Sequence, residues 1–102
     1  MKMPQRWRRR RGRRGRAPKP INLDSMPSME RFTPEPHSGG EPISIDPAEL
    51  ESLRLVDLEG LSQEEAGERM GISRGTVWRL LQSARKKVVQ ALTEARTLLV
   101  TR

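Results

Sequence analysis

Two helix starts separated by a single helix stop constrain the fold of this chain more than any other feature. Ser62 and Glu65 have capping-box spacing, in which each side chain accepts a hydrogen bond from the backbone N–H of the other residue. Gly71 can end that helix in the left-handed conformation without a Cβ clash. Ser73 then offers a second N-cap. The pattern predicts two helices joined by a three-residue break, which is helix-turn-helix spacing.

The second helix has an apolar face and a polar, cationic face. Its apolar residues recur at i, i+3, i+4 and i+7 and predict a buried stripe; they are Val77, Leu80, Leu81, Ala84, Val88, Ala91, Leu92 and Ala95. The other face offers groups that read base edges and contact phosphates in DNA. We assign to base edges Ser73, Arg74, Gly75, Thr76, Trp78, Arg79, Gln82 and Ser83, and to phosphates Arg85, Lys86 and Lys87. The helix should persist to about Arg96, which leaves its C-terminal half free for packing or dimerisation.

The run LRLVDLEGLSQEEAGERMGISRGTVWRLLQSARKKVVQAL resembles the helix-turn-helix of region 4 of bacterial RNA polymerase sigma factors. It is more closely similar to a family of small, functionally uncharacterised prokaryotic predicted DNA-binding proteins, which carry this motif behind a basic, proline-containing segment. The resemblance covers roughly residues 43–100. It implies an all-α, sigma region 4-like fold within the winged-helix-like superfamily of three-helical DNA-binding domains. The N-terminal segment is richer in arginine than the resemblance implies.

The positive charge is concentrated in two places. Residues 1–43 hold 11 Lys+Arg and 4 Asp+Glu, whereas residues 44–102 hold 9 of each and are neutral. Within the neutral part, residues 74–87 carry five bases and no acid, and residues 46–68 carry eight acids and one base. This polarity is typical of a domain that presents one face to phosphate.

Residues 1–42 are expected to form a mostly disordered basic arm, because prolines and glycines prevent regular elements. Its candidate binding residues are Arg6, Trp7, Arg8, Arg9, Arg10, Arg11, Arg13, Arg14 and Arg16. Such an arm can follow a phosphate backbone or enter a minor groove. Equally, it can be a solvated tail with non-specific affinity for any polyanion.

Residues 43–102 are expected to form the helix-turn-helix domain. Ile43-Ser44-Ile45 alternates as a short strand does and needs a partner, either residues 98–100 or the same segment of a second chain. Asp46-Pro47-Ala48-Glu49 is a strong helix start, and the helix should run to about Glu59, before Gly60. Its apolar residues Leu50, Leu53 and Val56 form one stripe, while Leu55 and Leu58 lie on another side. Such a helix needs cover on two faces, so we expect a homodimer or packing by the N-terminal segment.

The sequence contains few residues that could carry out catalysis. It has no cysteine and one histidine, His37, in a Pro/Ser/Gly loop, where we expect a solvated residue without a metal or acid–base role. The paired carboxylates, Glu49 with Glu51 and Glu64 with Glu65, lie at helix starts, where the helix dipole favours them. We therefore expect no enzyme activity, no cofactor and no metal. No apolar run is long enough to span a membrane, and we expect a cytoplasmic protein without a membrane partner.

The sequence as a whole predicts a protein that binds double-stranded DNA through a helix-turn-helix, as a transcriptional regulator. Two alternatives remain open. The first is an RNA- or ribosome-associated protein that binds through the arginine-rich arm. The second is a sigma-like adaptor that contacts RNA polymerase.

Overall fold

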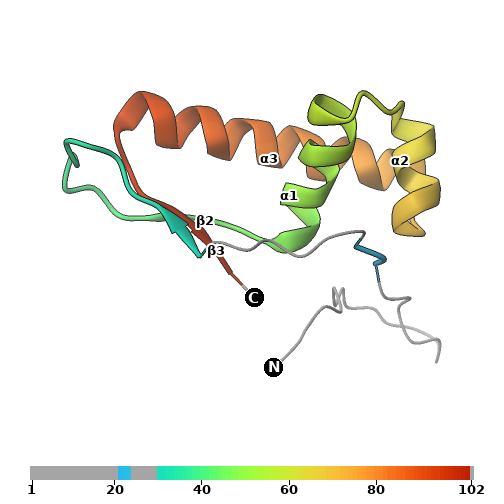
Figure 1. The fold of residues 1–102 in the computed structure, drawn as a ribbon, viewed down its shortest axis with the longest axis horizontal. Helices are drawn as coiled ribbons and strands as arrows, with labels where there is room; N and C mark the ends of the chain where they lie inside the picture. Colours follow the sequence, from blue (N-terminus) through green and yellow to red (C-terminus); the bar gives the residue numbers. More distant parts are fainter. Residues whose placement is uncertain (1–20, 24–29, 102) are drawn as a thin grey trace.

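The computed structural model describes residues 21–23 and 30–101, which form three α-helices, one π-helical turn and a small sheet (Figure 1). In chain order the elements are β1 (Arg31–Phe32), β2 (Ile43–Ile45), α1 (Pro47–Leu53), η1 (Arg54–Leu58), α2 (Gln63–Met70), α3 (Arg74–Glu94) and β3 (Leu98–Val100). The sheet lies beneath the C-terminal half of α3, and α1 and α2 pack around its N-terminal half (Figure 1). The candidate residues of the basic arm, all within residues 6–16, lie outside the described residues.

The predicted helix boundaries around the turn are confirmed. The Ser62 hydroxyl accepts from the Glu65 N–H at 3.0 Å, and the Glu65 carboxylate accepts from the Ser62 N–H at 2.9 Å. Gly71 adopts the left-handed conformation with φ of 70°. Ser73 caps α3 by accepting from the Thr76 N–H at 3.1 Å. Residues 71–73 are therefore the whole connection between α2 and α3.

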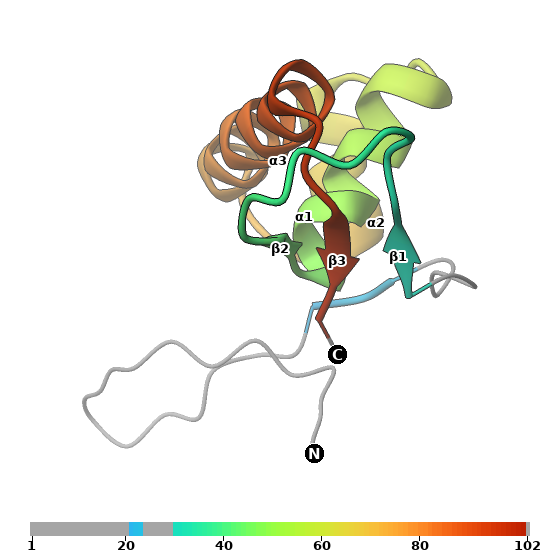
Figure 2. The same cartoon turned by 90° about the vertical axis from the view of Figure 1, so that its left-hand side faces the viewer.

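The sheet places β3 between the other two strands (Figure 2). β2 runs parallel to β3, with Ile43 opposite Leu98 and Ile45 opposite Val100. The predicted pairing of these two segments within one chain is thus confirmed. β1 pairs antiparallel with β3 and was not predicted, because its two residues carry no alternation. The all-α expectation is corrected to a mainly helical fold with a three-stranded sheet.

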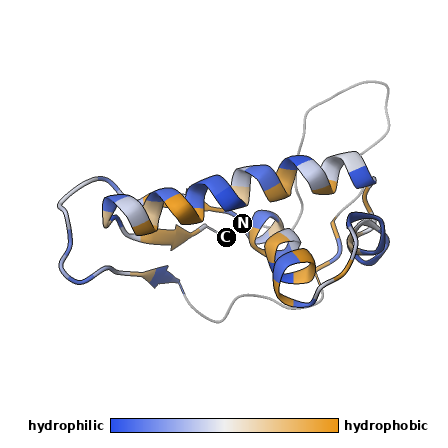
Figure 3. Cartoon of the chain, turned by 90° about the horizontal axis from the view of Figure 1, so that it is seen from above, coloured by the Kyte–Doolittle hydropathy of each residue, from blue (hydrophilic) through white to orange (hydrophobic). Residues whose placement is uncertain are grey.

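The buried side chains form two neighbouring clusters along α3. One lies where α1, η1, α2 and α3 meet and contains Ile21, Ala48, Leu55, Ala66, Met70, Val77 and Leu80. The other lies between α3 and the sheet and contains Ile45, Ala84 and Val100, with Leu50, Leu53, Val88 and Leu98 packed against it. Seen from above, α3 is hydrophilic on its outward side and hydrophobic toward these clusters (Figure 3). Ile21 supplies cover from the N-terminal segment, one of the two sources expected for the first helix.

The first helix does not continue as an α-helix to Glu59, as the sequence predicted. Residues 54–58 form a π-helical turn, closed by a bond from the Glu59 N–H to the Arg54 carbonyl at 2.9 Å. The wider turn inserts one residue into the helical period. Leu55 consequently lies fully buried in the same cluster that Val56 packs against, whereas Leu58 is 76% exposed.

The C-terminal end of α3 also differs from the prediction. The helix ends at Glu94 and not near Arg96, because Ala95 adopts the left-handed conformation with φ of 51°. Leu92 was assigned to the buried stripe, but its residue is 77% exposed. Its neighbour Ala91 is buried, so Leu92 lies just outside the covered stripe of the helix.

Gly67 allows the tight turn between α2 and α3. A Cβ at this position would lie 2.7 Å from the Ile72 carbonyl oxygen, a distance that requires the backbone to move. The Ile72 N–H also donates to the Gly67 carbonyl at 2.9 Å, which ties the turn back onto α2. Only glycine fits at position 67, because a side chain there would collide with the turn that follows α2.

We predict that Gly67→Ala lowers the free energy of unfolding by about 1–3 kcal/mol, because the added methyl group overpacks a backbone contact. The matched control is Gly75→Ala, where a Cβ would meet nothing closer than 3.9 Å. That substitution should raise stability by about 0.5–1 kcal/mol through helix propensity alone. Urea unfolding followed by circular dichroism measures both changes, and equal effects from the two variants would contradict the packing argument.

Candidate nucleic-acid interface

The outward face of α3 presents an open cationic surface. Arg74, Gly75, Arg79, Gln82 and Lys86 are all exposed. Within the part of the chain that the structure describes, Arg74, Arg79 and Lys86 make no ion pair. Their charges are therefore available to an external anion. This is the face that the sequence assigned to DNA.

The start of α3 is held rigidly by its cap. The Ser73 hydroxyl accepts from the Thr76 N–H and lies 3.0 Å from the Thr76 hydroxyl. Both hydroxyls can still accept or donate a further hydrogen bond, because a hydroxyl has one donor and two acceptor sites. Trp78, one turn further along, is 52% exposed and lies on the flank of this surface.

Two of the assigned residues face the protein interior. Ser83 is half-buried and donates a short hydrogen bond to the Glu49 carboxylate of α1. The Lys87 ammonium donates to both Glu49 oxygens, at 2.8 and 3.0 Å. The sequence placed Ser83 on the open face of α3 and Lys87 near phosphates, and neither position matches these contacts. The helical wheel alone could not show that α1 covers this flank.

Glu49 is buried and links two helices, a role that the sequence did not indicate. It was assigned to the start of α1, and the structure confirms that role, since its carboxylate accepts from the Asp46 N–H at 3.0 Å. It is also 5% exposed and joined to α3 through two side chains. The capping-box spacing was the only local signal for this residue, and it contains no information about a partner 34 or 38 residues away.

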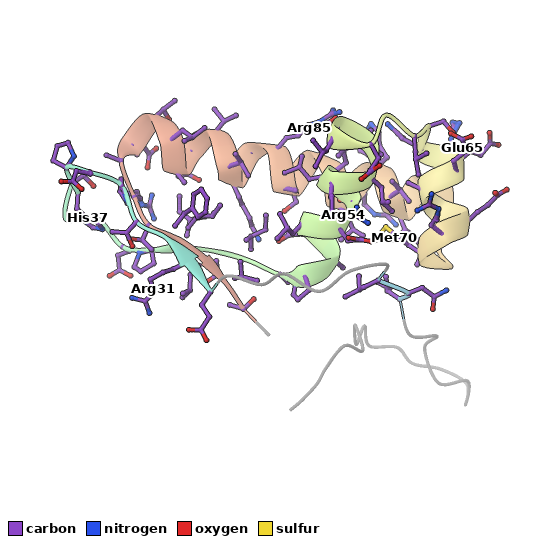
Figure 4. All side chains as sticks on the ribbon, viewed as in Figure 1. Arg31, His37, Arg54, Glu65, Met70 and Arg85 are labelled. Atoms are coloured by element: carbon purple, nitrogen blue, oxygen red, sulfur yellow. The ribbon has the colours of Figure 1, made fainter. Side chains whose placement is uncertain are left out.

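Arg85 is exposed but engaged on the opposite flank of α3. Its guanidinium donates to both oxygens of Asp57 in η1, at 2.8 and 3.0 Å. Figure 4 shows Arg85 beside the end of this π-helical turn. The hydrogen bonds from Arg85 lower the pKa of the Asp57 carboxyl. A phosphate can replace this exposed carboxylate, since both accept two parallel N–H bonds from a guanidinium.

Asp46, the N-cap of α1, has an unusual pKa. Burial raises it from 3.8 to about 6, and the hydrogen bond from the Glu49 backbone N–H only partly offsets this effect. The nearby Glu49 carboxylate raises it further. The start of α1 therefore carries a carboxyl group that is costly to ionise in the folded protein.

His37 is exposed in its loop, as predicted, but it has specific partners. Its Nδ1 accepts from the Gly39 N–H at 2.7 Å, so the hydrogen is on Nε2, which donates to the Thr97 hydroxyl at 3.0 Å. The ring connects the loop to the residue that precedes β3. Among the described residues, no group of three or more His, Cys, Asp or Glu side chains is arranged to hold a metal ion. No helix in the described ranges combines the length and apolarity needed to cross a membrane.

Comparison with known proteins identifies the family. The model of a family described as "Protein of unknown function DUF134" matches residues 6–102. The chain belongs to this family. It is 43% identical to a UPF0251 protein of Archaeoglobus fulgidus over 97 residues, which cover 95% of this chain and 91% of the relative. It is 52% identical to a UPF0251 protein of Pyrococcus furiosus over 90 residues, 85% and 83% of the two chains. No solved structure matches the chain significantly.

We predict that Glu49→Gln destabilises the domain by about 1–3 kcal/mol, because the half-buried Lys87 loses its counter-charge. Glu64→Gln, an exposed change in the first turn of α2, should cost less than about 0.5 kcal/mol. Adding Lys87→Met to Glu49→Gln should recover part of the loss. Thermal unfolding of the four proteins, wild type included, measures these differences. Equal stability of Glu49→Gln and Glu64→Gln would show that the buried link contributes nothing.

Asp46 makes stability depend on pH in a defined window. Because its folded pKa of about 6 exceeds the unfolded value of 3.8, the folded state binds the proton more tightly. The contribution of Asp46 is therefore most favourable below pH 4 and is lost as the pH rises through about 6. Asp46→Asn retains the cap acceptor but removes this titration.

The variant should be about 1–2 kcal/mol more stable than the wild type at pH 7.5, a figure reduced for partial solvent exposure. The difference should shrink by pH 4.5. Urea unfolding at both pH values tests this expectation. A wild type and variant with parallel pH profiles would refute it.

Proposed function

We propose that this protein binds double-stranded DNA by inserting α3 into the major groove, with α2 and α3 acting as a helix-turn-helix of the sigma region 4 type. On this proposal it regulates transcription. The observation that carries the proposal is the exposed, unpaired cationic face of α3 directly after a capped three-residue turn. A major groove is wide enough to admit an α-helix.

The charge distribution around α3 supports this assignment. The exposed side chains of α2 include Glu64, Glu65 and Glu68, whereas residues 74–87 of α3 carry five bases and no acid. In Figure 4, Glu65 points outward from α2, away from α3. A duplex that approaches from the α2 side would meet carboxylates, whereas one that lies along α3 meets arginine and lysine. The domain thus favours one orientation on a polyanion.

Within α3, the contacts divide the candidate residues by role. On this proposal Arg74, Gly75, Arg79 and Gln82 face base edges, and Gly75 permits close backbone approach. Lys86 is suited to a phosphate contact, and so is Arg85 once a phosphate replaces Asp57. Ser83 and Lys87 contribute by holding α3 against α1, through Glu49.

The competing function is binding of structured RNA through the arginine-rich segment, residues 6–16. Arginine-rich segments bind RNA in many contexts and need no groove-reading helix. The two functions differ in which part of the chain confers preference among ligands. On our proposal, α3 confers it and the arm adds affinity.

We predict that Arg79→Ala weakens binding to a preferred duplex, selected from a random pool, by about 1–3 kcal/mol and relaxes the choice of base beneath it. Arg31→Ala, an exposed arginine on β1 away from α3, is the matched control and should change little (Figure 4). Deletion of residues 1–17 should instead weaken binding to all duplexes and reduce the salt dependence, since each lost phosphate contact lowers the slope by about one unit. Titrations at several salt concentrations, with preferred and scrambled duplexes and a folded RNA, measure these effects.

The outcome that contradicts the proposal is specific. If the deletion abolishes preference among ligands while Arg79→Ala has no effect, the arm is the recognition element. Tighter binding to the folded RNA than to any duplex would then favour the RNA function.

A further inference from the structure

A short segment far from α2 in the sequence is packed against the α2–α3 turn. Ile21 is 8% exposed and belongs to the cluster formed by Met70, Val77 and their neighbours. Leu23 packs against the same cluster. Two apolar side chains therefore attach this segment to the helices that form the proposed DNA-binding unit.

Polar contacts fix the same segment at the turn itself. The Asn22 N–H donates to the Met70 carbonyl at 2.8 Å, which satisfies one of the carbonyls left open at the end of α2. The Asn22 side chain lies against Gly71, where a Cβ would come within 3.1 Å of its Nδ2. Gly71 thus makes room for Asn22 as well as adopting a left-handed conformation. In Figure 1 the segment runs beside the end of α2, where α3 begins.

The position of this attachment matters because the arginine-rich block precedes it in the chain. Arg16, the last arginine of the basic block, is five residues before Ile21 and so lies within about 18 Å of it. The whole block, residues 6–16, is within about 54 Å. The helix α3 has 21 residues and is about 31 Å long, so Arg16 can reach the N-terminal end of its outward face but not its C-terminal end.

We propose that Ile21, Asn22 and Leu23 are an anchor that starts the basic arm at the α2–α3 turn, so that the arginines nearest the anchor, beginning with Arg16, contact the DNA backbone next to the N-terminal end of α3. This inference rests on the proposed function and adds a direction to it. The three residues are positioning residues, because they touch the protein and not the DNA. An arm attached elsewhere, or a tail acting only as a free polycation, would contact phosphates on both sides of α3 alike.

The absence of cysteine from the sequence makes a direct test available. An iron chelate attached at Ala17→Cys, four residues before Ile21, reports where the start of the arm lies by cutting nearby DNA. The same chelate at Glu68→Cys, exposed in the last turn of α2, marks the anchor side, and at Thr93→Cys, exposed near the end of α3, it marks the far side. With the full chain on its preferred duplex, cuts from position 17 should coincide with those from position 68 and not with those from position 93.

Two variants separate the effect of the anchor from the effect of the positive charge of the arm. Insertion of ten Gly/Ser residues between Pro20 and Ile21 keeps both the arm and the anchor but lengthens the tether. Ile21→Ser combined with Leu23→Ser keeps the arm and removes the apolar anchor. Each should spread the cuts from position 17 over both sides and weaken binding about 3- to 10-fold at fixed salt, because the local concentration of the arm falls. Circular dichroism at the assay temperature verifies that the double variant is folded, and the insertion variant leaves the core unchanged.

The outcomes are distinct. Cuts from position 17 that fall equally on both sides in the full chain, or a one-sided pattern that persists in both variants, would overturn the anchor while leaving the proposed function intact. Failure of the full chain, without any chelate, to bind duplex DNA would overturn the proposed function and the anchor with it.

Discussion

The arrangement of the helices depends on the hydrogen bonds and the ion pair made by the buried Glu49 carboxylate. A desolvated carboxylate is stable only when donors surround it. Here they come from the Asp46 backbone, from Ser83 and from Lys87. Ser83 and Lys87 are four residues apart and so share one side of α3. Together with the buried stripe of α3, their attachment to α1 fixes the rotation of α3 about its own axis, with Arg79, Gln82 and Lys86 facing outward.

The α2–α3 turn is held by close backbone contacts as well as by side-chain burial. Gly67 lets the Ile72 carbonyl approach α2, and Gly71 leaves space for Asn22. The apolar cluster beneath the turn then joins α2 and α3 to η1 and to Ile21. An element that is tied to the core on one side keeps its orientation when its outward face meets a ligand. Such rigidity favours recognition, because side chains on a fixed helix lose little entropy on binding.

Much of this architecture could be predicted from residues that are near one another in the chain. The N-caps at Asp46, Ser62 and Ser73 and the stop at Gly71 are each specified within four residues, and all are confirmed. Residues 98–100 were one of two partners expected for residues 43–45, the other being the same segment of a second chain, and the structure shows the pairing within one chain. By contrast, the two residues of β1 gave no pattern. The π-helical turn gave none either, since the wheel that placed Leu55 outside the main stripe assumed a constant period.

The candidate interface likewise has features that could be predicted from the sequence and features that only the fold determines. Local sequence was sufficient to place a cationic face on α3, because helical periodicity and charge polarity depend only on neighbouring residues. It could not tell which flank of that face α1 would cover, so Ser83 and Lys87 were assigned to DNA and Leu92 to the core. Hydrogen bonds within a turn are encoded over three or four positions. The contacts of Glu49 with α3, of Asp57 with Arg85 and of Asn22 with the end of α2 join residues 28 to 48 positions apart, and only the packed fold selects such partners.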